Sequence, residues 1–437
     1  MNRPAKITLD MAIKDAATFI AELYESLKNP HVGEEPLGIS SERFRIASQF
    51  YVVGDTVGKL NDLEETIYES VRSDGFISPT AAEWLLHKAM TEAITTKDGL
   101  IGEREFQPAL TKALAELKRC LRETPSDWEY WIRVVGFADE GFPSSFGQAS
   151  FRMMNEADVN DLAGRIERAI DRTIISDEQK EAMKSRMSSS VRRTYFGHVT
   201  ATLAVSAVDS DAGADSALKV LRLTLDVLNF FISWDHPPTR GIRLLWEGGG
   251  IPEQFLAFKK TPPEGFTLKG PLKGLVMAAT VKPFENTPFF RRASELLAKQ
   301  QPNAFEKRVL SALQWAGRAS VQERPDQALL FYVISLENLL LGSNRDSELG
   351  YRFRVRGAHV LGLDLDSRKD IQRQLKDLYA LRSTIVHSGS AQIRESDISL
   401  IQYFAKEATG FVLTDDAFRD MVTEQDLEKY FDAKVLQ

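Results

Sequence analysis

Residues 377–389 read Asp-Leu-Tyr-Ala-Leu-Arg-Ser-Thr-Ile-Val-His-Ser-Gly, and this stretch decides how the C-terminal part of the chain is interpreted. The spacing of its apolar residues predicts a helix, and Gly389 is suited to end it. Arg382 and His387 lie five residues apart, which leaves their side chains about 140° apart around a regular helix. For both to reach one ligand, the long arginine arm, an unwound last turn or a second copy of the helix is needed.

An arginine and a histidine together supply what RNA cleavage without a metal requires. Guanidinium is a permanent cation whose fork matches phosphate oxygens, and imidazole takes and gives protons near neutral pH. RNA brings its own nucleophile, the 2′-OH, which DNA lacks. The spacing alone also occurs by chance in many proteins. In that interpretation His387 is a helix-end residue favoured by the helix dipole.

Three blocks in order give this pair a context. They are ALLFYVISLENLLLG at 328–342, LGYRFRVRGAHVLG at 349–362 and LYALRSTIVHSG at 378–389. Together they resemble the HEPN family of all-helical domains, and most closely its Apea-like branch. The resemblance covers roughly residues 320–415.

The resemblance implies a helical bundle that forms a homodimer, with two R-x4–6-H motifs around one cleft. Many HEPN domains are metal-independent endoribonucleases in toxin–antitoxin, CRISPR or phage-defence systems. Carried over, Arg382 and His387 are the catalytic pair, RNA is the substrate, and a phage-derived trigger or regulatory partner is expected. Ser383 stands where many active members have Asn, Asp or His, although the Apea-like branch often has Ser there. Other HEPN domains are non-catalytic scaffolds or bind nucleotides, and both alternatives stay open here.

Glu337 and Arg356 are the supporting residues that we expect near this pair. Glu337 is surrounded by leucines on a helix that should be buried, so it needs a cationic partner, either Arg356 or Arg382. It either forms a structural ion pair or orients the catalytic arginine. Ten basic and six acidic residues between 342 and 394 give a local charge of +4, against −11 elsewhere. That excess fits an anionic ligand, or a solvated helix face whose charges pair locally.

The whole chain of 437 residues is long enough for two or three domains. We expect a multidomain, mainly α protein with a helical region at 1–125 and an α+β domain at 126–290, a possible sensor. The HEPN bundle would occupy 291–437.

Hydrophobic periodicity predicts the individual elements. Helices are expected at 7–28, 41–72 (one or two), from Ser78 and Pro79 onward, 105–122, 155–187 and 216–232, with a turn at 211–215. Strands are expected from Trp128, at 199–210 and, as short segments, at 241–281. Six further helices are expected, two within 293–320 that Pro302 separates and one each at 327–341, 351–361, 371–387 and 396–411.

Composition excludes several classes of protein. A net charge of −7 argues against a general nucleic-acid coat protein, and one cysteine, Cys120, rules out an intramolecular disulfide. The N-terminus lacks a signal-peptide pattern and no run of about 18 apolar residues occurs, so we expect a cytoplasmic protein without membrane contact. No HExxH, paired-cysteine or EF-hand pattern appears, and His87 shows no ligand-spaced partner. No metal and no cofactor are therefore expected.

Overall fold

The computed structural model describes residues 8–28, 43–47, 50–53, 55–71, 77–96, 99–123, 125–138, 140–173, 175–234, 244, 255–259, 265–269, 280–322, 324–342 and 349–435. Over these residues the protein is mainly helical, as predicted, and it contains fifteen helices. The chain divides into two compact units. One comprises Met1–Glu129, Val205–Ser216 and Ala257–Gly265, and the other Tyr130–Ala204, Ala217–Leu256 and Phe266–Gln437. The expected division into three domains stays a prediction.

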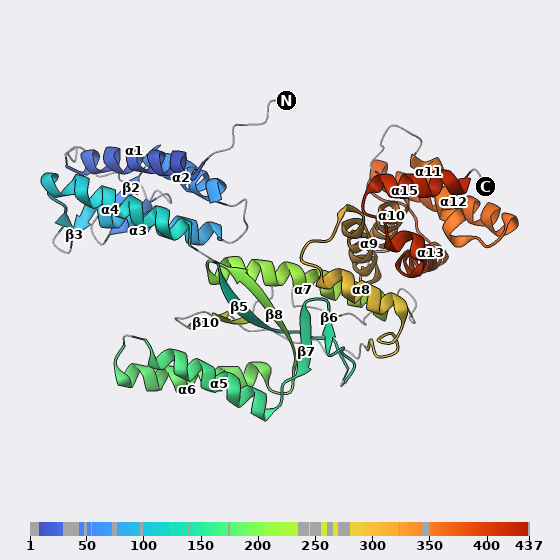
Figure 1. The fold of residues 1–437 in the computed structure, drawn as a ribbon, viewed down its shortest axis with the longest axis horizontal. Helices are drawn as coiled ribbons and strands as arrows, with labels where there is room; N and C mark the ends of the chain where they lie inside the picture. Colours follow the sequence, from blue (N-terminus) through green and yellow to red (C-terminus); the bar gives the residue numbers. More distant parts are fainter. Residues whose placement is uncertain are drawn as a thin grey trace. The chain divides into compact units, whose positions relative to one another are not determined.

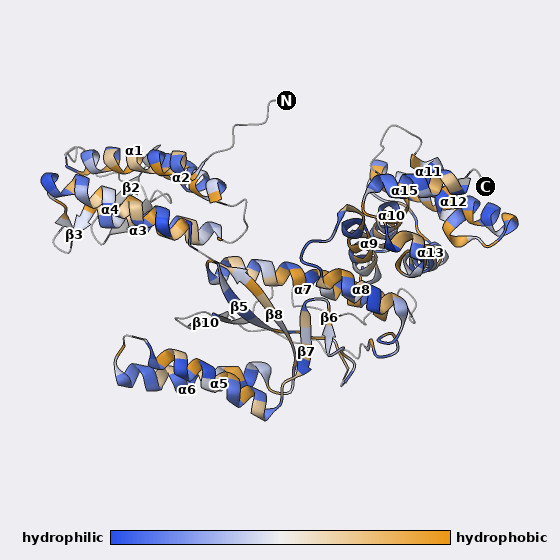
Figure 2. Cartoon of the chain, in the orientation of Figure 1, coloured by the Kyte–Doolittle hydropathy of each residue, from blue (hydrophilic) through white to orange (hydrophobic). Residues whose placement is uncertain are grey.

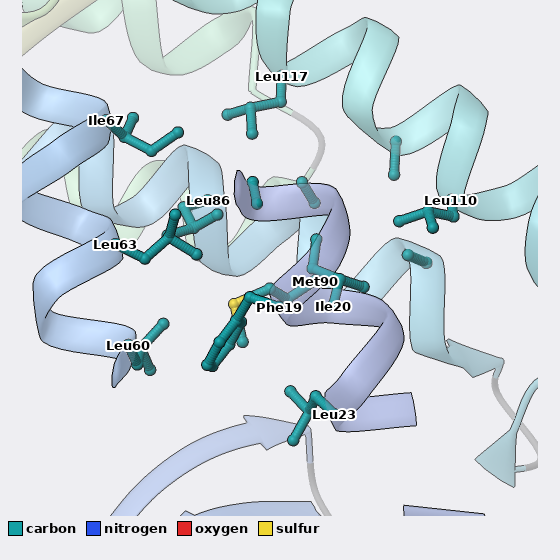
Figure 3. Close-up of a cluster of buried hydrophobic side chains, with 14 of the residues drawn as sticks. Phe19, Ile20, Leu23, Leu60, Leu63, Ile67, Leu86, Met90, Leu110 and Leu117 are labelled. Atoms are coloured by element: carbon teal, nitrogen blue, oxygen red, sulfur yellow. The ribbon is translucent and has the colours of Figure 1, made fainter. Parts of the chain in front are cut away.

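The first unit is built from four amphipathic helices (Figure 1). They are α1 (Leu9–Lys28), α2 (Asp55–Val71), α3 (Pro79–Ile94) and α4 (Glu103–Leu121). Between α3 and α4 lie two short antiparallel strands, β3 (Thr95–Thr96) and β4 (Gly99–Leu100). Hydrophobic and hydrophilic residues alternate along these helices (Figure 2). Their apolar faces form one buried cluster that includes Ile20, Leu63, Ile67, Leu86 and Met90 (Figure 3).

The start of α3 is confirmed, whereas the expected helical start at residue 41 is wrong. The Ser78 hydroxyl accepts a hydrogen bond from the backbone N–H of Ala81 (3.1 Å), and Pro79 follows at the first helical position. Residues 43–47 and 50–53 instead form two antiparallel strands, β1 (Arg43–Ala47) and β2 (Phe50–Val53). Their sequences, RFRIA and FYVV, are rich in the aromatic and β-branched residues that favour strands.

A six-stranded sheet has the strand order β10-β9-β5-β8-β7-β6. The strands are β5 (Ser126–Arg133), β6 (Ser145–Phe146), β7 (Ala149–Met153), β8 (Val199–Ala207), β9 (Phe255–Lys259) and β10 (Gly265–Lys269). β6 pairs antiparallel with β7, and β7 antiparallel with β8. The strands expected from Trp128, at 199–210 and within 255–269 are confirmed. The expected strand over 241–250 lies, except for Leu244, outside the described residues, and so does the expected strand over 274–281, except for Thr280 and Val281, which form no strand.

Two further expectations for this region need correction. The predicted helix at 155–187 is two helices, α5 (Glu156–Asp171) and α6 (Asp177–Tyr195), because Ser176 caps a second start with Gln179. The predicted turn at 211–215 belongs to α7 (Ser210–Ile232). The Asp209 carboxylate accepts hydrogen bonds from the backbone N–H groups of Asp211 and Ala212. The helix therefore begins before Gly213, which lies in the predicted turn.

The C-terminal part is entirely helical across its described residues (Figure 1). Its helices are α8 (Pro288–Ala298), α9 (Ala304–Ser320), α10 (Pro325–Leu340), α11 (Leu349–Leu361), α12 (Leu365–Ser388), α13 (Glu395–Thr414), α14 (Asp416–Arg419) and α15 (Glu424–Val435). α10 packs against α9, α11, α12 and α13 and is therefore the central helix of this group. The six predicted helices are confirmed as α8 to α13, and α14 and α15 come in addition.

Across the described residues, every helix is too short or too polar to cross a lipid bilayer.

Candidate functional site

Helix α12 carries both motif residues and is regular to its end. Asp364 caps its start with Ser367, and Gly389 ends it with φ 78°, a left-handed conformation that glycine adopts without strain. The Gly389 N–H donates to the Ile385 carbonyl (2.8 Å), so the last turn is closed. An unwound last turn therefore does not bring Arg382 and His387 together.

Arg382 faces Glu337 on α10. Its Nη2 lies 3.5 Å from Glu337 Oε1, and the two side chains are 28% and 19% exposed. Of the two partners expected for Glu337, Arg356 and Arg382, the structure shows Arg382. Tyr379, one turn before Arg382 on α12, places its ring 5.6 Å from the guanidinium. Its hydroxyl interacts with the Glu337 carboxylate and favours the charged form. Phe353 packs against that ring, with centroids 5.1 Å apart.

The electrostatics of this pair follow from its partial burial. Burial raises the pKa of Glu337, and the charge of Arg382 with the hydrogen bonds from Tyr379 and Arg382 offsets only part of the rise. Burial, reinforced by the negative Glu337, also raises the pKa of Tyr379. The carboxylate therefore lies beside a cation, at a place where burial still disfavours its charge.

His387 lies apart from this cluster. It is exposed near the end of α12 and forms no hydrogen bond or ion pair with any described residue. Ser383, next to Arg382, is half-buried. The structure thus brings Arg382 to Glu337, while a single chain does not bring Arg382 to His387.

Arg356 was the other partner expected for Glu337, but it points inward toward a different carboxylate, Glu428. It is 5% exposed, and its Nη1 donates to the Leu340 carbonyl (3.0 Å) and to Glu428 (3.2 Å). Its guanidinium lies 4.9 Å from the ring centre of Phe431, and Arg352 also pairs with Glu428. Burial acts to raise the pKa of Glu428, but the two arginines hold it below its ordinary value. Glu428 lies on α15, a helix that was not predicted from the sequence.

Arg308 on α9 is a further residue of this region that the sequence did not indicate. Its Nε donates to the Asn338 carbonyl (3.1 Å), it also donates to the Leu341 carbonyl, and Nη1 pairs with Glu424 (3.0 Å). It thereby satisfies free carbonyls at the end of α10. An open pocket of about 370 Å³ lies beside it and is lined by Arg308, Glu337, Asn338, Leu341, Gly342, Leu349, Arg382 and Glu424. No motif surrounds Arg308 in the sequence, so only its contacts show its position.

The excess of basic residues between 342 and 394 is largely paired. Six of the described basic residues lie in ion pairs, namely Arg352, Arg356, Lys369, Arg373, Arg382 and Arg394. Arg354 lies over the ring of Tyr351 (5.2 Å), and Arg368 donates to the Gly362 carbonyl. Local pairing therefore accounts for much of this charge, as the alternative interpretation held.

One group of potential metal ligands occurs among the described residues, in the first unit. Donor atoms of Glu64, Glu83 and His87 lie within 4.8 Å of one another. The expectation that His87 has no ligand-spaced partner is therefore wrong. Glu83 precedes it by four residues on α3, one helical turn away, and this spacing was visible in the sequence.

Compared with known proteins, the chain matches no family model, no curated protein and no solved structure. The HEPN resemblance stays a prediction that rests on the three blocks at 328–342, 349–362 and 378–389.

Proposed function

We propose that this protein is a metal-independent endoribonuclease of HEPN type that cleaves RNA through its 2′-OH. One observation carries the proposal. Helix α12 presents an exposed His387 near its end and, five residues earlier, an Arg382 that lines an open pocket. A proton-transfer group that solvent reaches and a cation beside a pocket are the two parts that this chemistry needs.

In the proposed reaction His387 accepts the proton of the 2′-OH. The 2′-oxygen attacks phosphorus and the bond to the 5′-oxygen breaks, which leaves a 2′,3′-cyclic phosphate. The departing 5′-oxygen takes a proton from an imidazolium and becomes a hydroxyl. Arg382 stabilises the negative charge that gathers on the phosphate oxygens in the transition state.

A second copy of the chain would bring the two groups together. A two-fold axis beside α12 can set His387 of one copy near Arg382 of the other, because both partners use the same surface. Val386, next to His387, is 52% exposed, and Tyr403 on α13 is 55% exposed. Apolar side chains at the surface are suited to such an interface. The proposal therefore includes a homodimer.

The biological setting is proposed from the resemblance alone. It places the enzyme in the cytoplasm, in defence against phage by abortive infection, under the control of a trigger or regulatory partner. A non-catalytic scaffold is the second candidate, and one contact favours it. Arg382 already pairs with Glu337, as a purely structural arginine would.

The test is to incubate the purified full chain with total RNA in the presence of EDTA. We expect cleavage products with cyclic phosphate ends, and their loss in both Arg382→Ala and His387→Ala. Lys376→Ala is the matched control, because it removes an exposed positive charge from the same helix. Intact RNA with every trigger tried, from a protein that still dimerises, would favour the scaffold. A thermal shift with ATP that Arg382→Ala abolishes would favour nucleotide binding.

A further inference from the structure

We propose that Glu64, Glu83 and His87 form a binding site for a divalent transition-metal ion on the first unit. The site lies on α2 and α3 and shares no residue with the proposed nuclease site. Nuclease chemistry at Arg382 and His387 does not depend on it.

The geometry of the three donors supports this assignment. His87 Nε2 lies 2.6 Å from Glu64 Oε1, and a Glu83 carboxylate oxygen lies within 4.8 Å of both. Glu83 and His87 share one face of α3, while Glu64 reaches them from α2. Three donors from two helices thus converge on one point.

The helices that carry the donors are fixed by the core beneath them. Leu63 and Ile67 flank Glu64 on α2, and Leu86 is next to His87 on α3. All three side chains belong to the buried cluster of the first unit (Figure 3). The side chains of Glu64 and His87 are half-buried, at 21% and 17% exposed, whereas the side chain of Glu83 is exposed. A rigid base with one adjustable ligand suits the binding of an exchangeable ion.

Charge at the site also favours a cation. Two carboxylates share this small space, and Glu83 has no ion pair with any described residue. The neighbouring Lys88 is engaged elsewhere, since its Nζ lies over the ring of Trp84 (5.5 Å) and 3.9 Å from Glu92. A bound dication would offset the repulsion between the carboxylates. The competing occupant is a proton on His87, which would make a simple ion pair with Glu64.

The donor set indicates the kind of metal. Ca²⁺ and Mg²⁺ prefer oxygen ligands throughout, whereas imidazole with carboxylates suits Zn²⁺ and its neighbours in the first transition row. Zn²⁺ bonds of roughly 2.0–2.2 Å in a tetrahedron would set the donor atoms about 3.4 Å apart. Glu64 and His87 would separate slightly, and the exposed Glu83 would move inward. Three protein ligands leave the fourth position to water.

The experiment uses the full chain after treatment with EDTA and removal of the chelator. Zn²⁺ is titrated by calorimetry, and Tm is measured with and without Zn²⁺. We expect one bound Zn²⁺ per chain and a higher Tm. Glu83→Gln removes an exposed ligand without disturbing the core, and its zinc affinity should fall by more than the roughly 10- to 100-fold that loss of an outer-shell partner costs. Glu65→Gln, an exposed carboxylate next to Glu64, is the control and should bind as the unaltered chain does.

Co²⁺ gives a second readout that does not depend on stability. Its visible absorption should show a nitrogen- and oxygen-ligated ion that His87→Gln abolishes. Absence of Zn²⁺ binding, or a Glu83→Gln variant that binds Zn²⁺ as tightly as the unaltered chain, would overturn the proposal and leave Glu64 and His87 as an ion pair only.

Discussion

The guanidinium of Arg382 on α12 lies 3.5 Å from the carboxylate of Glu337 on α10, and Tyr379 contacts both. This contact joins two segments separated by more than 40 residues of sequence. Arg382 therefore links α12 to α10 with the same guanidinium that the proposed chemistry uses. Experiments on the site must therefore separate a loss of stability from a loss of function.

Replacing Arg382 by Ala should lower the free energy of unfolding by about 1–3 kcal/mol, because it leaves a largely buried carboxylate without its cation. In a Glu337→Gln background the same replacement should cost clearly less. Urea denaturation of the four proteins in a double-mutant cycle measures this coupling. Additive effects would show that the 3.5 Å contact contributes no stability.

Replacing Glu337 by Gln should change how stability depends on pH. The pKa of Glu337 is raised above its ordinary 4.5, so the folded state holds this proton more tightly than the unfolded chain does. The stability that this bound proton contributes is fully present at pH values below the ordinary pKa of Glu337, and it is lost as the pH rises through the raised pKa. The unfolding free energy of the unaltered chain minus that of Glu337→Gln should therefore fall across this window. A difference that grows with pH would mean that Arg382 outweighs the burial.

Replacing His387 by Ala should leave the fold unchanged, since this side chain is exposed and forms no hydrogen bond or ion pair with a described residue. We expect the free energy of unfolding to change by less than about 0.5 kcal/mol, while RNA cleavage is lost. Urea denaturation and the EDTA cleavage assay, run on one preparation, check both parts. A strongly destabilised variant would show that His387 has a structural role.

Replacing Glu428 by Ala should be strongly destabilising, by roughly 3–5 kcal/mol, because it leaves Arg356 buried without its counter-ion. Glu407→Ala, an exposed carboxylate on α13, should change the unfolding free energy by less than about 0.5 kcal/mol. Equal stability of the two variants in urea would contradict the importance of α15 for this part of the fold.

Two glycines in helices of the second unit should respond in opposite ways to Ala. A Cβ on Gly317 of α9 would lie 1.7 Å from the backbone oxygen of Asp226 on α7, so α7 and α9 would have to move apart. We expect a loss of about 3 kcal/mol or more. A Cβ on Gly164 of α5 meets only the end of Arg168, and Ala should stabilise by about 0.5–1 kcal/mol. Thermal unfolding of both variants checks the signs.

Local patterns were enough to locate most elements of this chain. The start of α3 at Ser78 and Pro79 and the break at Pro302 before α9 follow from capping and proline chemistry, which acts within a few residues. Where a predicted element was wrong, a different local signal in the sequence determined the structure. Strands β1 and β2 stand where a helix was expected, because β-branched and aromatic residues outweighed the helical spacing. The Asp209 cap starts α7 before Gly213.

The sequence by itself placed Arg382 and His387 on one helix, about 140° apart, and required a cation for Glu337, because helical geometry and the cost of burying charge are local rules. It left open whether Arg356 or Arg382 would pair with Glu337. In the tertiary structure Glu337 pairs with Arg382, and Arg356 pairs with Glu428, which lies 72 residues after it in the chain. Packing of α10, α11, α12 and α15 made that choice, since which charges meet depends on which helix faces lie against each other, and no short stretch of sequence specifies that.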